Sequence, residues 1–356
     1  MSDNRKEAEE KMEKAIFISA DCWICVYDLL PPRQLGLGIA LISHRFNIYV
    51  DEHFKTRKLA LRNIQIRCKI VKNGTKEMEI VNNHYGEPMP IPQIQMPRKV
   101  IGFRHIHISF IDKNVLTLLR HFRPLFAACQ IYLTIETKTD RISEFILHNI
   151  WPLLGKNIYF IELTASIFHR LRKIVPSILN DCPSLRVVSF YAGDLFTEFP
   201  ADDSAMASDG QAVNKWLFTP FQSNVPKVFK SSLHMDYVNW SSNVEAIEAA
   251  FASASSPASF IIVFWFLRSY SVLPFVLTNE LTHEQLALKR ITNSCRFLLI
   301  RCPIARDESK WTKWEKEASG WRICDQWKHI DIAINDENKI GDGLLDATPG
   351  PSDQQK

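Results

Sequence analysis

Apolar residues recur every three or four positions in three successive stretches near the start of the chain, residues 23–30, 35–46 and 49–61. This spacing places the apolar side chains of each stretch on one face of a helix. Pro31 and Pro32 separate the first two stretches, because proline cannot continue a helix. The pattern therefore predicts three short amphipathic helices.

The next segment predicts a β-hairpin. Residues 64–70 alternate apolar and polar side chains, which is the period of a half-buried strand. Asn73-Gly74 then supplies a residue pair that tight hairpin turns favour, and residues 78–80 resume the alternation. Prolines recur between residues 88 and 97 and predict an extended linker there.

From about residue 100 the chain repeats itself. Four segments carry an apolar–x–apolar core, and consecutive cores lie 27 or 28 residues apart. Helical patterns occupy the intervals, over residues 115–126, 142–154 and 167–179. A strand-plus-helix unit of this length is typical of leucine-rich-repeat solenoids, whose units stack because one unit cannot bury its own apolar face. The four cores are Ile106/Ile108, Leu133/Ile135, Ile161/Leu163 and Val188/Phe190.

The regularity weakens after residue 190. Val228 and Ile261 are candidate starts of further strands at wider spacings. The last third predicts a strand-rich region with one helix, followed by a polar tail. The predicted strands cover residues 260–266, 272–278, 297–301 and 330–334, and the predicted helix covers residues 306–318.

The composition is that of an ordinary globular protein, and it excludes several classes of function. Of the 356 residues, 46% are hydrophobic and 23% charged, and a formal net charge of +4 is too small to indicate a nucleic-acid interface. No apolar stretch reaches the roughly 18 residues of a membrane span, and the charged N-terminus does not resemble a signal peptide. We expect no nucleic-acid or membrane partner and a location in the cytoplasm or nucleus; unconventional secretion stays open.

The eight cysteines are scattered along the chain. A chain of this length does not need disulfides to fold, so we expect reduced and mostly buried thiols. Cys22-Trp23-Ile24-Cys25 has the spacing of a redox or metal motif. No predicted strand precedes this motif and no second cysteine pair follows it, so packing of both sulfurs on a helix face is the stronger interpretation.

Candidate chemistry elsewhere is sparse. His105 and His107 would lie on the same side of a strand and could both reach a metal ion, but the sequence places no third ligand. Exposed residues on a sheet are the simpler interpretation. The chain has no phosphate-binding loop, nucleophile elbow, zinc-protease motif or kinase motif. We therefore expect no enzyme activity, no metal ion and no cofactor.

Several blocks of the sequence resemble a known family. Residues 16–54 resemble an F-box, with Leu30-Pro31-Pro32-x-x-Leu35 between the first two predicted helices and Ser-His-Arg-Phe-Asn at residues 43–47. F-boxes usually open with Leu-Pro, whereas Ile18-Ser19 stands here. The remainder is similar to nematode F-box proteins, which carry a repeat-like, F-box-associated region. The similar blocks are residues 50–55, 90–93, 149–154, 181–186 and 301–308.

The resemblance implies an α/β fold and a function. F-box proteins are substrate receptors of SCF-type cullin ubiquitin ligases: the F-box docks on a Skp-type adaptor, and the following region captures the target protein. The implied parts are a charged segment (1–14), a three-helix F-box-like module (15–62), a hairpin with a proline-rich linker (63–99), a leucine-rich-repeat-like solenoid (100–257), a strand-rich F-box-associated region (258–336) and a polar tail (337–356).

Two candidate surfaces follow. Three helices of this size bury little apolar area by themselves, so a partner is expected to cover part of them. The candidate adaptor-binding residues are Ile18, Trp23, Val26, Leu29, Pro31, Leu35 and Ile39. Side chains that alternate with the buried cores project together from neighbouring strands and suit an unidentified target protein. The candidate target-binding residues are His105, His107, Tyr132, Thr134, Phe160, Glu162 and Ser189.

Two other functions stay open. A free-standing repeat scaffold that has lost adaptor binding is the principal alternative, because the opening of the F-box departs from the family pattern. Adaptor binding distinguishes this scaffold from a ligase receptor. A hydrolase is less supported, because no pair of nucleophile and base can be placed in the sequence.

Overall fold

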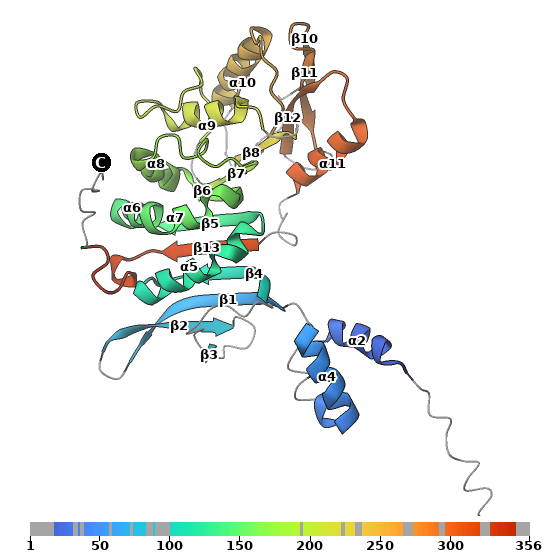
Figure 1. The fold of residues 1–356 in the computed structure, drawn as a ribbon. Coiled ribbons are helices and arrows are strands. Elements are labelled where there is room, and N and C mark those ends of the chain that lie inside the picture. The colour runs from blue at the N-terminus through green and yellow to red at the C-terminus, as the bar shows by residue number, and fades with distance from the viewer. Residues whose placement is uncertain are drawn as a thin grey trace, which may run out of the picture. The chain divides into compact units, whose positions relative to one another are not determined.

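The protein is a mixed α/β molecule whose chain divides into two compact units (Figure 1). A helical unit holds residues 1–59 and 98–101, and a sheet unit holds residues 60–97 and 102–356. The computed structural model describes residues 18–30, 35, 39–56, 59–71, 74–82, 88–89, 100–192, 195–221, 225–231, 237–265, 273–291, 296–320 and 328–346.

Two α-helices and one short 3-10 helix make up the described part of the helical unit. They are α2 (Ala20–Leu29), η1 (Ile39–Leu41) and α4 (His44–Thr56). Ser19 caps α2, since its hydroxyl accepts a hydrogen bond from the Cys22 N–H at 3.3 Å. Tyr27, Leu35 and Val50 form the buried core of this unit.

The predicted boundary between a second and a third helix is wrong. α4 runs without interruption across residues 46–49, because Phe46, Val50 and His53 form one continuous helical stripe. The predicted third helix also ends too late, since β1 (Leu59–Ile70) already begins at Leu59. In the described residues a three-helix module is therefore not evident, and Pro31 lies outside them.

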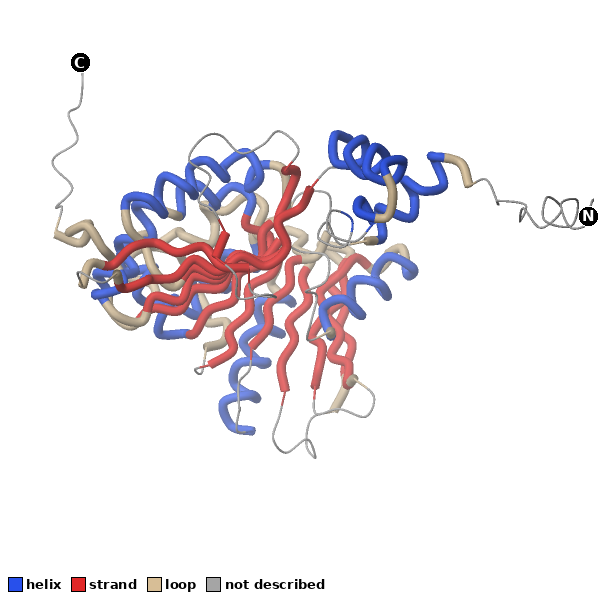
Figure 2. The backbone as a smooth tube through the Cα atoms, turned by 90° about the horizontal axis from the view of Figure 1, so that it is seen from below, coloured by secondary structure: helices blue, strands red, loops and turns tan. Residues whose placement is uncertain are grey.

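One large mixed sheet organises the other unit (Figure 2). Its central strands β4, β13, β5, β6, β7, β8 and β9 run parallel, and antiparallel strands extend it at both ends. The order is β10 (Phe275–Asn279), β11 (Glu284–Arg290), β12 (Arg296–Pro303), β9 (Phe260–Trp265), β8 (Lys227–Ser231), β7 (Val187–Ala192), β6 (Ile158–Thr164), β5 (Ile131–Thr137), β13 (Lys328–Ile334), β4 (Val100–Ile108), β1, β2 (Lys76–Asn82) and β3 (Pro88–Met89).

Helices follow the parallel strands and cover one face of the sheet. Short polar side chains start them: Asp112, Thr139, Thr164 and Ser208 each accept a backbone N–H as an N-cap. The ring of Phe168 packs against Phe190 of β7, which shows that α8 lies on this face. The helices are α5 (Lys113–Ala127), α6 (Asp140–Asn149), α7 (Trp151–Leu154), α8 (Ala165–Ile174), α9 (Asp209–Phe218) and α10 (Tyr237–Ala252).

The four predicted apolar cores are confirmed as buried strand residues, but their stacking order is not that of a simple solenoid. β13 lies between β4 and β5, so the first two predicted repeats are not neighbours. Ile330, Ile332 and Ile334 are all buried, because this strand carries the same alternation as the two strands beside it. The strand-rich third of the chain thus shares the sheet of the repeat-like region, and no closed solenoid is formed.

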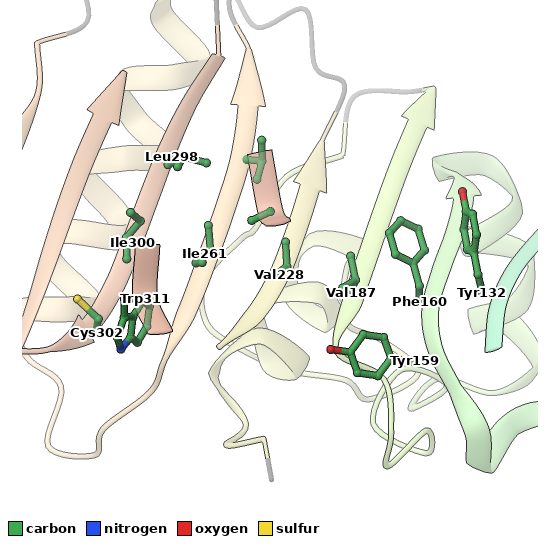
Figure 3. Close-up of a cluster of buried hydrophobic side chains, with 12 residues drawn as sticks. Tyr132, Tyr159, Phe160, Val187, Val228, Ile261, Leu298, Ile300, Cys302 and Trp311 are labelled. Carbon is green, nitrogen blue, oxygen red and sulfur yellow. The ribbon is translucent and has the colours of Figure 1, made fainter. Parts of the chain in front are cut away.

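The opposite face of the sheet carries α11 (Glu308–Ser319) over its β9 side. Trp311 and Ala318 of this helix belong to a buried cluster that crosses six strands (Figure 3). This predicted helix is confirmed, whereas the sequence pattern missed both α10 and β11. The cluster runs from Tyr132 and Phe160 through Val187, Val228 and Ile261 to Leu298, Ile300 and Cys302.

Among the described residues, the structure contains no helix with both the length and the apolar character needed to cross a membrane.

Candidate protein-interaction surfaces

The predicted target-binding residues lie on one face of the sheet, the face that carries α11. β4, β5, β6 and β7 supply them in alternation with the buried apolar cores. β13 adds His329 and Asp331 between β4 and β5, where they pair in register with His105 and His107. The sequence showed the alternation of β13 but not its position, so it missed both residues as members of this surface.

Aromatic rings form a continuous row across four strands, β4, β13, β5 and β6. The ring of His329 stacks between His105, at 4.5 Å between ring centroids, and Tyr132, at 4.4 Å. Tyr132 then meets Phe160 edge-to-face at 4.3 Å. The structure therefore brings His105, Tyr132 and Phe160 together, but it does so through His329, which fills the gap between β4 and β5.

Burial lowers the pKa of both stacked histidines. The pKa of His329 falls to about 4, mainly because the protein excludes water from the ring and secondarily because His105 is close. The pKa of His105 is lowered by the same desolvation, although Asp331 opposes it. The two stacked imidazoles are therefore uncharged at neutral pH.

Hydrogen bonds fix the polar side chains beside this row. His107 Nδ1 lies 2.7 Å from Asp331 Oδ2, and Thr134 Oγ1 lies 2.9 Å from His329 Nε2. Glu162 accepts hydrogen bonds from two hydroxyls, those of Tyr132 and of Ser189, the latter at 3.2 Å. These contacts hold all seven predicted target-binding residues in one packed arrangement. Tyr132, Phe160 and Ser189 are buried in it, and the other four side chains are half-buried.

Tyr191 extends this surface and was not predicted. Its side chain is partly exposed. The pKa of Tyr191 is raised to about 12, first by burial and then by the carboxylates of Glu136, Glu162 and Asp331. The phenol therefore stays protonated at neutral pH.

A shallow hollow adjoins this surface next to the end of α11. Phe160, Glu162, Ser189 and Tyr191 line one side of it, and residues 318–320 line the other. Two cations, Lys230 and Arg296, also line the hollow. Lys230 Nζ donates to Gly320 O at 2.8 Å, and Arg296 donates to Ser319 O at 2.9 Å. These contacts complement the negative end of the α11 dipole.

The described histidines of this surface pair with neighbouring side chains. In the part of the chain that the structure describes, no group of three His, Cys, Asp or Glu side chains is placed to hold a metal ion. His107 pairs with Asp331, and His105 stacks on another ring, so the two histidines do not converge on one point.

The predicted adaptor-binding residues divide into two sets. Ile18, Val26 and Leu29 are 39%, 43% and 84% exposed. Leu35 is fully buried in the core of the helical unit, and Trp23 and Ile39 are half-buried against that core. Pro31 lies outside the described residues. Three further apolar side chains are exposed and were not predicted: Leu41, Ile42 and Ile48.

The exposed residues of α2 form a stripe of their own. Ile18, Cys22, Cys25 and Leu29 are spaced three or four residues apart, Val26 lies four residues after Cys22, and all five are exposed. We call these five residues the outer stripe of α2. The sequence pattern predicts that Trp23 and Leu30 share a face with this stripe. In the structure these two side chains pack against the core instead, so the apolar residues of this segment lie on two faces.

The expectation that the cysteines are mostly buried is wrong for the CxxC pair. Cys22 and Cys25 are exposed, because Trp23 and Tyr27 occupy the side of α2 that faces the core. Cys182 and Cys302 are buried as expected, whereas Cys295 and Cys324 lie outside the described residues. The six described cysteines are all free thiols.

Comparison with known proteins gives no match. No protein-family model, no curated protein and no solved structure matches this chain. The similarity to F-box proteins therefore stays a prediction from the sequence.

Proposed function

We propose that this chain is the substrate-recognition subunit of an SCF-type cullin ubiquitin ligase in the cytoplasm or nucleus. In this proposal the helical unit is an F-box-like module that docks on a Skp-type adaptor. The repeat-like sheet unit captures the target protein, and the chain itself carries out no bond chemistry. The observation that carries the proposal is the outer stripe of α2.

The energetics of the helical unit favour a partner on this stripe. Among its described residues, the fully buried apolar core consists of Tyr27, Leu35 and Val50, and units of this size bury little apolar surface by themselves. Val26 and Leu29 are neighbours one turn apart on α2 and remain in contact with water. Covering each of them at an interface would contribute roughly 1–3 kcal/mol. The exposed side chains of Leu41, Ile42 and Ile48 enlarge the apolar area that a partner could cover.

The unusual opening of the F-box is compatible with this proposal. Ser19 is the N-cap of α2 and accepts a hydrogen bond from its first turn. The helix therefore begins without the proline that is usual in F-boxes. Ile18 precedes the cap and stays partly exposed, so an apolar anchor is retained at the position where the family has leucine.

Introducing negative charge into the outer stripe should weaken binding of the adaptor. We expect Val26→Asp/Leu29→Asp to reduce recovery of a co-expressed nematode Skp-type adaptor at least about tenfold, because a carboxylate in an apolar interface is left without a partner. Leu281→Asp is the matched control, since this leucine is 76% exposed in the turn between β10 and β11 of the sheet unit. The measurement is co-purification of the full chain with the adaptor.

Equal recovery of the adaptor by both variants would refute the docking surface. Absence of adaptor from the wild-type preparation would instead favour the free-standing scaffold. Thermal unfolding of each variant, followed by circular dichroism, checks that both remain folded.

A further inference from the structure

Cys22 and Cys25 differ from the other described thiols, because both are exposed. The other four are half-buried or buried: Cys68, Cys129, Cys182 and Cys302. For the last three of these, burial raises the pKa of the thiol and so keeps it protonated and unreactive. An oxidant in solution therefore reaches the exposed pair first.

Core packing does not explain why α2 carries this pair. Trp23 and Tyr27 occupy the side of the helix that faces the core, and Tyr27 is fully buried there. The two sulfurs lie instead in the outer stripe, between Ile18 and Leu29. Two thiols are too few for a zinc site, and no third ligand is placed beside them within the described ranges. Chemistry between the two sulfurs is the interpretation that remains.

Helical geometry permits a disulfide between these residues at the cost of a local adjustment. Their Cα atoms are about 5 Å apart in a regular helix, inside the range of roughly 4.4–6.8 Å that a disulfide spans. Their Cβ atoms start about 5–6 Å apart and must approach to about 4 Å. Cys22 lies in the first turn of α2, whose amides have no helical partner, so movement there costs little. An exposed disulfide under this strain is readily reduced again.

The N-cap residue of α2 contacts one of the two sulfurs. Ser19 Oγ lies 3.2 Å from Cys22 Sγ and donates a hydrogen bond to it. A donor in this place stabilises the negative charge that develops on the sulfur during thiol–disulfide exchange. The same hydroxyl accepts the Cys22 N–H at 3.3 Å. Movement of Cys22 toward Cys25 therefore also changes the cap of the helix.

We propose that Cys22 and Cys25 form a reversible disulfide when a small disulfide such as glutathione disulfide oxidises the chain. One sulfur attacks the oxidant and releases one glutathione, and the second sulfur then displaces the glutathione that is still bound. One S–S bond breaks and one forms. The cysteine pair loses two electrons to the oxidant, and its two protons pass to the two glutathione thiols. This disulfide does not rest on the proposed function.

The same pair couples oxidation to adaptor docking, and this part of the inference does rest on the proposed function. Both sulfurs belong to the outer stripe of α2, so an adaptor docked there would shield them from the oxidant. The disulfide would in turn alter the start of the helix, where Ile18 and Ser19 lie. Because such coupling is reciprocal, oxidation and docking should oppose each other.

The first measurement uses the full chain without adaptor, in a buffer of glutathione disulfide and reduced glutathione. Residues 15–33 form one tryptic peptide that contains both Cys22 and Cys25 and no other cysteine. Free thiols are blocked with iodoacetamide before digestion. We expect mass spectrometry to find this peptide without blocking groups and lacking one hydrogen per sulfur. Dithiothreitol should restore both thiols.

Cys25→Ser separates an internal disulfide from ordinary surface reactivity. Without a second sulfur, Cys22 should keep its bound glutathione, so this mixed disulfide should accumulate at least about tenfold above its level in wild type. Cys22→Ser should cause the same accumulation on Cys25. The matched control is Cys68→Ser, at a half-buried position of β1, which should leave oxidation of the pair unchanged.

Two results would overturn the disulfide. One is wild-type peptide that still carries two blocking groups after oxidation. The other is an equal level of glutathione adduct in wild type and in both single variants, which would show that the two thiols react independently.

The second measurement adds the Skp-type adaptor before the oxidant. At an adaptor concentration of about ten times its Kd, oxidation of the pair should slow about tenfold, in proportion to the fraction of chain left uncovered. An unchanged rate with the adaptor bound would overturn the coupling and would refute the outer stripe as the docking surface. The disulfide is decided by the adaptor-free measurement, so the two failures are distinguished.

Discussion

At the scale of single residues, His329 shows how one side chain joins two parts of the sequence. Its ring lies between His105 and Tyr132, although it follows them by about two hundred residues in the chain. Thr134 Oγ1 lies within hydrogen-bond distance of its Nε2, at 2.9 Å. The neighbouring rings exclude water from both flat sides of the imidazole. This desolvation disfavours the protonated form of His329.

Protonation of His329 should contribute to loss of stability in acid. The unfolded chain takes up a proton at this histidine near pH 6.5, whereas the folded protein resists protonation until about pH 4. Protons therefore bind preferentially to the unfolded state in this window, and stability falls as the pH decreases from 6.5 to 4. The full loss is on the order of 3 kcal/mol.

Urea unfolding at several pH values measures this contribution. His329→Gln should flatten the dependence of the unfolding free energy between pH 6.5 and pH 4, whereas His121→Gln, at an exposed position of α5, should leave it unchanged. The same slope in wild type and His329→Gln would show that this ring is not the group that titrates.

At the scale of elements, β13 holds the parallel part of the sheet together. It pairs with β4 on one side and β5 on the other, and Ile332 stands in register with Ile108 and Ile135. These three side chains are fully buried and form one row under the helices. β13 therefore links the first strand of the repeat-like region to the second.

Truncation of Ile332 should destabilise the sheet unit strongly. We expect Ile332→Ala to lower the unfolding free energy by about 2–4 kcal/mol, because the cavity lies in a packed row that cannot collapse around it. Ile70→Ala is the control, since Ile70 is 71% exposed at the end of β1, and its effect should stay below about 1 kcal/mol. Similar losses for both variants in chemical denaturation would contradict the central position of β13.

Much of the sheet was predictable from the sequence, because its strands carry strict alternation. The cores around Leu133, Ile161 and Val188 were correctly predicted, and so was the strand at residues 330–334. The position of that strand was not predictable, since any parallel strand with buried isoleucines on one face fits beside any other. The regular spacing of the repeats predicts that β4 and β5 are direct neighbours in the sheet. In the structure β13 lies between them.

The helical unit was harder to predict for a different reason. α2 has apolar residues on two sides, and only contacts with Leu35 and Val50 decide which side faces the core. Helical periodicity shows that such residues share a face but not where that face points. For this reason the sequence predicts packed sulfurs for Cys22 and Cys25, whereas both are exposed. Tyr191 was missed because its place beside Glu162 depends on how β6 and β7 pair, which the local pattern does not show.

At the scale of the whole molecule, the two proposed surfaces belong to different compact units. Each unit has its own buried core, so substitutions on one surface should leave the other unaffected. Glu136→Gln/Glu162→Gln should recover the Skp-type adaptor as wild type does. Loss of the adaptor in this variant, with the fold intact, would contradict this independence.

The most direct measurement of the central claim is hydrogen–deuterium exchange of the full chain with and without a saturating Skp-type adaptor. The account predicts slower exchange within residues 18–56 upon binding, strongest in α2, and no change in β5, β6 or β13, because the outer stripe of α2 is the proposed contact. Unchanged exchange in α2, or protection that falls on the sheet unit instead, would contradict the assignment of this chain as a ligase receptor.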